Sequence, residues 1–109
     1  MTLARLICPA VRWTAETGFA HAWPAIDRAL ELGVGGFILF GAAGARGDEL
    51  ARVSEEIGQR AGRPLLLGAD LERGAGQQGR GLTELPAPAA LAALRDPAVV
   101  PWAGAVTGR

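Results

Sequence analysis

The sequence predicts a parallel α/β fold, on the basis of three observations. Three short apolar runs, at residues 3–8, Gly36–Phe40 and residues 65–69, alternate with two segments of helical periodicity. The centres of the apolar runs lie about thirty residues apart, which is the size of a βαβ unit. The last two runs are continuously apolar, as expected of strands that are buried on both faces.

Each expected helix has start and stop signals. The first opens at Pro24, whose fixed φ suits a first helical position, and stops at Gly33. The second opens at Asp48, where an acid favours the positive end of the helix dipole, and ends near Arg60. In both segments apolar residues recur on one helical face, so we expect both helices to pack against the sheet.

The pattern changes after residue 69. A glycine-rich loop covers residues 70–81, a proline-rich turn follows, and residues 89–94 are expected to be helical. A last helix is expected to start at Asp96-Pro97 or at Pro101. Residues 1–109 are treated as one domain, and we expect the architecture to continue beyond them, because a three-stranded parallel sheet leaves both edges open.

Composition narrows the class of protein. Half of the 109 residues are apolar and the formal net charge is zero, which is typical of a globular segment and does not indicate binding to nucleic acid or to an anionic membrane. The single cysteine excludes an intrachain disulfide. The sequence has neither a signal-peptide pattern nor an apolar run of about 20 residues, so a cytoplasmic location is expected.

Charged residues gather directly after the third apolar run. Ligands of parallel α/β proteins bind at the carboxyl ends of the strands, and Asp70, Glu72 and Arg73 would lie at that edge. A purely structural interpretation stays open, in which Asp70 caps a turn and the other two form a solvated ion pair. Asp70 and Glu72 are not expected to be the two carboxylates of a glycosidase, since both would approach a sugar from the same side.

Two other features of the sequence have alternative interpretations. Gly74, Gly76 and Gly79 match the glycine spacing of a dinucleotide-binding loop, but the first does not follow the strand directly and a helix signal is missing after the third. Nucleotide binding is therefore not favoured. The three tryptophans could stack on sugars, but packing against the sheet is the preferred interpretation; they are Trp13, Trp23 and Trp102.

Three motifs, in order, carry a family resemblance. They are ELGVGGFILF at residues 31–40, PLLLGADLERG at 64–74 and GLTELPAPAAL at 81–91. Together they resemble the N-terminal domain of glycoside hydrolase family 3. The resemblance spans nearly the whole chain, but departs from the usual glycine, arginine and arginine at Arg73, Ala75 and Gln78.

The resemblance implies a fold and an activity. The chain would be about the first three strands, with their helices, of a (β/α)8 TIM-type barrel, and its partner would be the remainder of that domain. The whole would hydrolyse terminal β-linked glucose or N-acetylglucosamine residues by a retaining mechanism without a metal or organic cofactor. A non-catalytic sugar-binding or degenerate remnant of such a barrel is the alternative.

The same resemblance gives the loop residues their expected roles. Asp70 matches an aspartate that binds sugar hydroxyls, and Glu72 and Gly74 would support the loop. Arg73 departs from the pattern and is a second candidate for substrate binding, because it could compensate for the missing arginines by reaching into the site. The family's Lys-His region and nucleophilic aspartate lie further downstream, so the chain is expected to contain no catalytic residue and to be inactive alone. His21, the single histidine, precedes the first helix and does not match that region.

Overall fold

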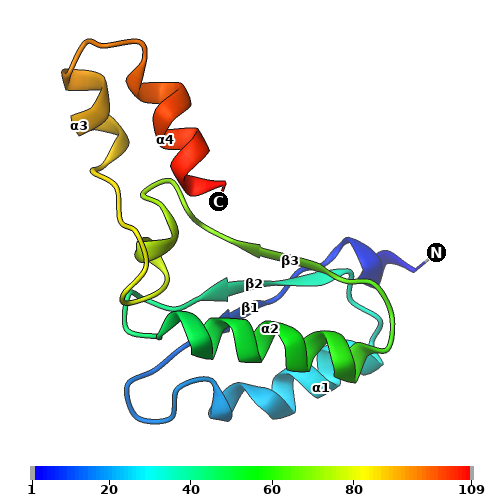
Figure 1. Ribbon diagram of the computed structural model, residues 1–109. Helices are drawn as coiled ribbons and strands as arrows, with labels where there is room; N and C mark the ends of the chain where they lie inside the picture. Colours follow the sequence, from blue (N-terminus) through cyan, green and yellow to red (C-terminus); the bar gives the residue numbers. More distant parts are fainter. Residues whose placement is uncertain (1, 109) are drawn as a thin grey trace.

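The computed structural model describes residues 2–108, which form three strands, four α-helices and three short 3-10 helices (Figure 1). In chain order the elements are η1 (Leu3–Leu6), β1 (Ala10–Arg12), η2 (Ala20–Ala22), α1 (Trp23–Glu31), β2 (Gly36–Phe40), α2 (Gly47–Ala61), β3 (Leu66–Ala69), η3 (Ala75–Gln77), α3 (Pro88–Ala93) and α4 (Val99–Thr107). Within residues 2–108 no helix is long and apolar enough to cross a membrane.

The strands form one parallel sheet in the order β1-β2-β3. Val11 is paired with Leu39, and Phe37 with Leu67, in the register of the two ladders. The βαβ order predicted from the sequence is therefore confirmed. Gly36 makes the approach of β2 and β3 possible, because a Cβ there would lie 1.9 Å from the carbonyl oxygen of Leu66.

Both crossover helices lie against the same face of the sheet (Figure 1). Phe37, 1% exposed, is buried between the sheet and this helical layer, together with Ile26 of α1 and Ile57 of α2. The helix boundaries agree with the sequence signals: Pro24 lies in the first turn of α1, and Gly62 ends α2 in the left-handed conformation. Burial of this apolar layer is the main source of stability that the structure provides.

Arg60 of α2 makes ionic and cation–π contacts with α1 at the surface of the helical layer. The Arg60 guanidinium of α2 stacks 4.2 Å from the ring centroid of Trp23 and lies 2.9 Å from an Asp27 carboxylate oxygen, both in α1. Glu56 completes the cluster at 2.7 Å from Arg60. The hydrogen bonds that Arg60 donates to the two carboxylates raise the pKa of Arg60 further, so it stays charged.

The first strand is not where the sequence predicted it. Residues 3–6 form the 3-10 helix η1, and the strand is the shorter segment β1, at residues 10–12. Leu3, Leu6 and Ile7 are exposed, so this apolar run does not enter the core. The actual strand contains a charged residue, Arg12, and apolarity alone could not identify it.

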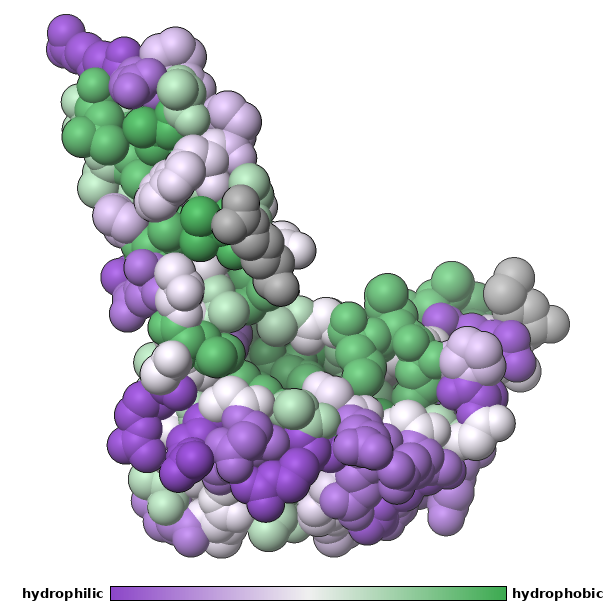
Figure 2. Space-filling view, in the orientation of Figure 1, coloured by the Kyte–Doolittle hydropathy of each residue, from purple (hydrophilic) through white to green (hydrophobic). Residues whose placement is uncertain are grey.

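The second face of the sheet is apolar and open in the part of the chain that the structure describes. Ile38 and Phe40 point to this face and are half-buried, and Leu66 of β3 is 65% exposed. Figure 2 shows apolar residues gathered above the sheet, in the angle between the sheet and the arm formed by α3 and α4. The arm stands away from the sheet (Figure 1), and Trp102 on it is 55% exposed. The prediction that all three tryptophans pack against the sheet is therefore wrong for Trp102.

Candidate functional site at the carboxyl edge of the sheet

The carboxyl ends of the three strands form the candidate site. β1 ends at Arg12, whose guanidinium lies 4.5 Å from the ring centroid of Phe40, the last residue of β2. This cation–π contact keeps a positive charge on the open face of the sheet. Sequence patterns did not single out Arg12, because a lone arginine at a strand end has no local signature.

Asp70 follows β3 directly, and its carboxyl group lies against that of Glu72. A hydrogen bond with Glu72, the negative charge of Glu72 and a small desolvation together raise the pKa of Asp70 above its ordinary value of 3.8. Both residues are exposed. Asp70 and Glu72 are two residues apart on one loop and interact with each other, whereas the two carboxyl groups of a retaining glycosidase lie about 5–5.5 Å apart, on opposite sides of the glycosidic bond.

Gln78 connects the ends of two strands through its side-chain amide. Its Oε1 accepts a hydrogen bond of 2.9 Å from the backbone N–H of Gly41, just after β2. Its Nε2 donates one of 2.9 Å to the carbonyl oxygen of Asp70, just after β3. The residue is only 6% exposed, so these bonds satisfy a buried amide. At the sequence level Gln78 was only a departure from the family pattern.

Arg73 is held by its own loop. Its guanidinium makes an ion pair of 2.7 Å with Glu84, and its backbone N–H and carbonyl bond to Gln77 and Leu85. The predicted contact of Arg73 with a substrate would therefore require it to leave Glu84. The predicted solvated pair of Glu72 with Arg73 is replaced by this longer-range pair.

Gly74 permits the fold of the loop. Its φ of +77° is in the left-handed region, and a Cβ there would lie 2.8 Å from the carbonyl oxygen of Thr83. Gly76 donates a backbone hydrogen bond of 2.7 Å to the same carbonyl. The glycine-rich segment thus folds back on residues 82–85, with a turn after Gly79 where a dinucleotide-binding loop would open a helix.

A cavity of about 480 Å³ opens beside these loops. It collects residues that follow each strand and residues from the first turns of α2: Trp13, Gly44, Arg46, Asp48, Glu49, Arg52 and Arg80. The indole N–H of Trp13 is buried and has no hydrogen-bond partner within residues 2–108. A hydrogen bond from Arg46 lowers the pKa of Asp48, which keeps that carboxylate ionised. Asp70 does not line this cavity.

His21 lies on η2, in the connection between β1 and α1, where its Nδ1 is 2.8 Å from the Thr17 hydroxyl oxygen, and it does not line the cavity. Among residues 2–108 no group of three or more histidine, cysteine, aspartate or glutamate side chains could hold a metal ion.

Comparisons with known proteins leave the family open. No protein-family model matches the chain, and no curated protein is significantly similar to it.

Proposed function

We propose that this chain is part of a glycoside hydrolase barrel of the family 3 type, and that its carboxyl-edge loop contributes to the binding of a terminal β-linked glucose or N-acetylglucosamine. The observation that carries the proposal is the position of Asp70. It follows the third parallel strand at the edge where α/β folds bind ligands, and the residues around it resemble the family motif except at Arg73, Ala75 and Gln78.

The chemistry of the loop is compatible with sugar binding. A carboxylate can accept charge-assisted hydrogen bonds from two adjacent hydroxyl groups. The hydrogen bonds of Gln78 hold the main chain of Asp70 in place relative to the end of β2. The carboxylate of Asp70 is therefore exposed to ligands but anchored at its main chain. Glu72 raises the affinity of Asp70 for protons, and sugar hydroxyls that donate to Asp70 would favour its ionised form.

The open apolar face supports the barrel part of the proposal. In a parallel barrel one face of each strand meets the helices and the other meets the interior side chains of the remaining strands. Ile38, Phe40 and Leu66 lie on the face that the helices leave open, which suits such an interior. Arg12, which lies beside Phe40 on this open face, would then be inside the barrel, near its carboxyl edge.

Sugar binding can be tested on the 109-residue chain with matched variants. Methyl β-glucoside and N-acetylglucosamine are titrated into the wild type, Asp70→Asn and Asp96→Asn, with amide chemical shifts as the readout. Asp96 is an exposed acid on the α3–α4 arm and serves as the control. Loss of charge-assisted hydrogen bonds should weaken binding in Asp70→Asn by about tenfold or more. Equal affinity in all three proteins, or no binding at all, would refute the sugar site.

Two further measurements test the proposal, and the second distinguishes the enzyme from the non-catalytic remnant. The isolated chain should not turn over aryl β-glucosides or aryl N-acetyl-β-glucosaminides, because the nucleophile is proposed to lie outside it. The reading frame after codon 109 then decides between the alternatives: a continuation with a Lys-His motif and a later aspartate supports the enzyme, and a stop codon supports the remnant. Turnover by the isolated chain that Asp70→Asn abolishes would contradict the assignment.

A further inference from the structure

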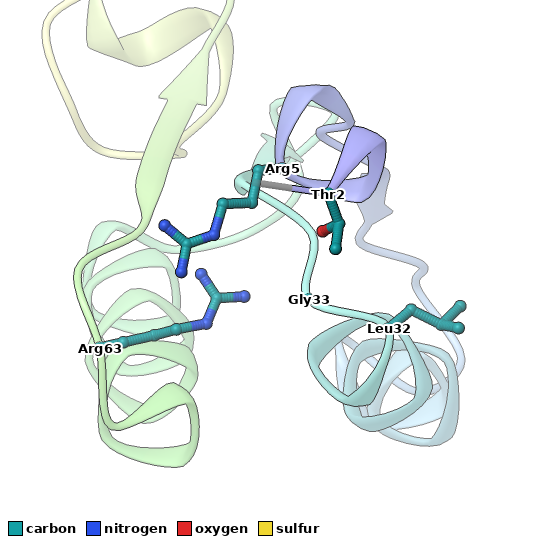
Figure 3. Close-up of a pocket in the computed structure, with 5 residues that line it drawn as sticks. All are labelled: Thr2, Arg5, Leu32, Gly33 and Arg63. Carbon is teal, nitrogen blue, oxygen red and sulfur yellow. The ribbon is translucent and has the colours of Figure 1, made fainter.

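A second cavity lies at the opposite end of the sheet, where the strands begin. It has a volume of about 520 Å³ and is lined by Thr2, Arg5, Leu32, Gly33 and Arg63 (Figure 3). These residues come from the three segments that precede β1, β2 and β3. The cavity is therefore built from parts of the chain that only the parallel sheet brings together.

Two arginines direct their guanidinium groups toward each other across this cavity (Figure 3). Arg63 is half-buried and donates a hydrogen bond of 2.6 Å to the carbonyl oxygen of Val34, which holds its side chain in place. Arg5 is exposed and makes no side-chain hydrogen bond in the part of the chain that is described. Neither arginine forms an ion pair within residues 2–108, whereas five of the other arginines there pair with an acid; these are Arg28, Arg46, Arg52, Arg60 and Arg73.

No acid among the residues that line the cavity balances the two guanidinium groups. The carboxyl ends of α1 and α2 lie just before Leu32 and Arg63, but a helix end supplies only about half of a negative charge. Two facing guanidinium groups repel each other unless an anion lies between them.

We propose that this cavity binds a tetrahedral oxyanion of the phosphate class. A carboxylate has two oxygens and is satisfied by the fork of one guanidinium, whereas a phosphate has enough oxygens to accept forks from two guanidinium groups at once. The Thr2 hydroxyl at the rim can donate a further hydrogen bond. The site is separate from the proposed sugar site, which lies at the other end of the strands.

Inorganic phosphate is the probe for the test. It is titrated into the full 109-residue chain at constant ionic strength, by calorimetry, with acetate titrated in parallel. Arg5→Ala is the informative variant, because Arg5 is exposed and its side chain makes no hydrogen bond within residues 2–108. We expect the affinity of Arg5→Ala for phosphate to be lower than that of the wild type by about tenfold or more, because the variant loses charge-assisted hydrogen bonds. Arg5→Glu, which places an acid opposite Arg63, should abolish phosphate binding.

Arg28→Ala is the matched control. Arg28 carries the same charge near the same end of the molecule, but it pairs with Glu31 and does not line the cavity. Its loss should change phosphate affinity by less than about twofold. If Arg5→Ala and Arg28→Ala weaken phosphate binding equally, the effect is one of net charge and not of a specific site. If acetate binds as tightly as phosphate, the cavity does not select tetrahedral oxyanions. Either result, or no phosphate binding by the wild type, overturns the proposal.

A chemical readout separates this site from the sugar site. Phosphate should protect Arg5 and Arg63 from a dicarbonyl reagent, with modification mapped by mass spectrometry, and should leave Arg80 unprotected. The protection should be the same in Asp70→Asn, since that residue lies at the other end of the sheet. Uniform modification of all three arginines with and without phosphate would contradict the site, whatever the outcome at Asp70.

Discussion

Replacing Gln78 with leucine should strongly destabilise the protein. The change removes the amide that connects the ends of β2 and β3 while keeping a side chain of similar size. The N–H of Gly41 is buried and would lose its partner, at a cost of about 1–3 kcal/mol. Asp70 is exposed, so its carbonyl can turn to water, and the loss of that bond costs about 0.5–1.5 kcal/mol.

The two terms predict a loss of about 1.5–4.5 kcal/mol in the free energy of unfolding. For a chain of this size that corresponds to a fall of about 6–36 °C in Tm. Urea and thermal denaturation followed by circular dichroism measure both quantities. Gln78→Glu should also be less stable than the wild type, because it keeps an acceptor for the Gly41 N–H but places a buried negative charge against the carbonyl oxygen of Asp70.

Gln59→Leu is the control for this series. Gln59 is exposed on α2, and its amide bonds only to Glu55 of the same helix, at 3.1 Å. Its replacement should change stability by no more than about 0.5 kcal/mol. If Gln78→Leu is as stable as Gln59→Leu, the buried amide does not connect the strand ends and the account of the site is wrong.

Three further outcomes follow from the structure. Glu72 raises the pKa of Asp70 in the folded protein, so protonation of Asp70 stabilises the fold. This stabilisation is present below pH 3.8 and is lost as the pH rises through the raised pKa. Asp70→Asn should abolish this pH dependence in urea midpoints measured from pH 3 to 7. Gly74→Ala should cost about 1–3 kcal/mol, whereas Gly58→Ala, in open space on α2, should stabilise by about 0.5–1 kcal/mol in the same assay. Arg60→Ala should lower the urea midpoint, because it removes a stacked cation and two half-exposed ion pairs, and an unchanged midpoint would contradict the contact between α1 and α2.

Apolar patterning predicted the centre of the fold but not its first strand. The run Gly36–Phe40 was identified with its observed bounds, because a central parallel strand is covered by neighbours on both sides and both faces favour apolar residues. β1 lies at the edge of the sheet and is only three residues long. Its Arg12 is accommodated by the ring of Phe40, a contact that depends on the register between strands and leaves no local signal in the sequence.

The candidate site was predictable in position but not in its connections. Asp70 follows β3 as the sequence indicated, since the end of an apolar run marks the end of a buried strand. The partners of Gln78 and Arg73 were not predictable, because they lie 37 and 11 residues away along the chain. Such pairs depend on how the loops cross, and periodicity within a segment carries no information about that.

The glycines at the two ends of β2 have a consequence for the evolution of this chain. Any side chain at Gly36 or Gly41 would collide with a backbone oxygen, of Leu66 or of Gln78, at less than 2 Å. Surface positions of α1 and α2 can diverge freely, but these two positions cannot change unless the main chain of a neighbour moves. Distant relatives should therefore keep the interval between these two glycines, even where overall similarity has disappeared. That spacing is a search pattern for relatives of this chain.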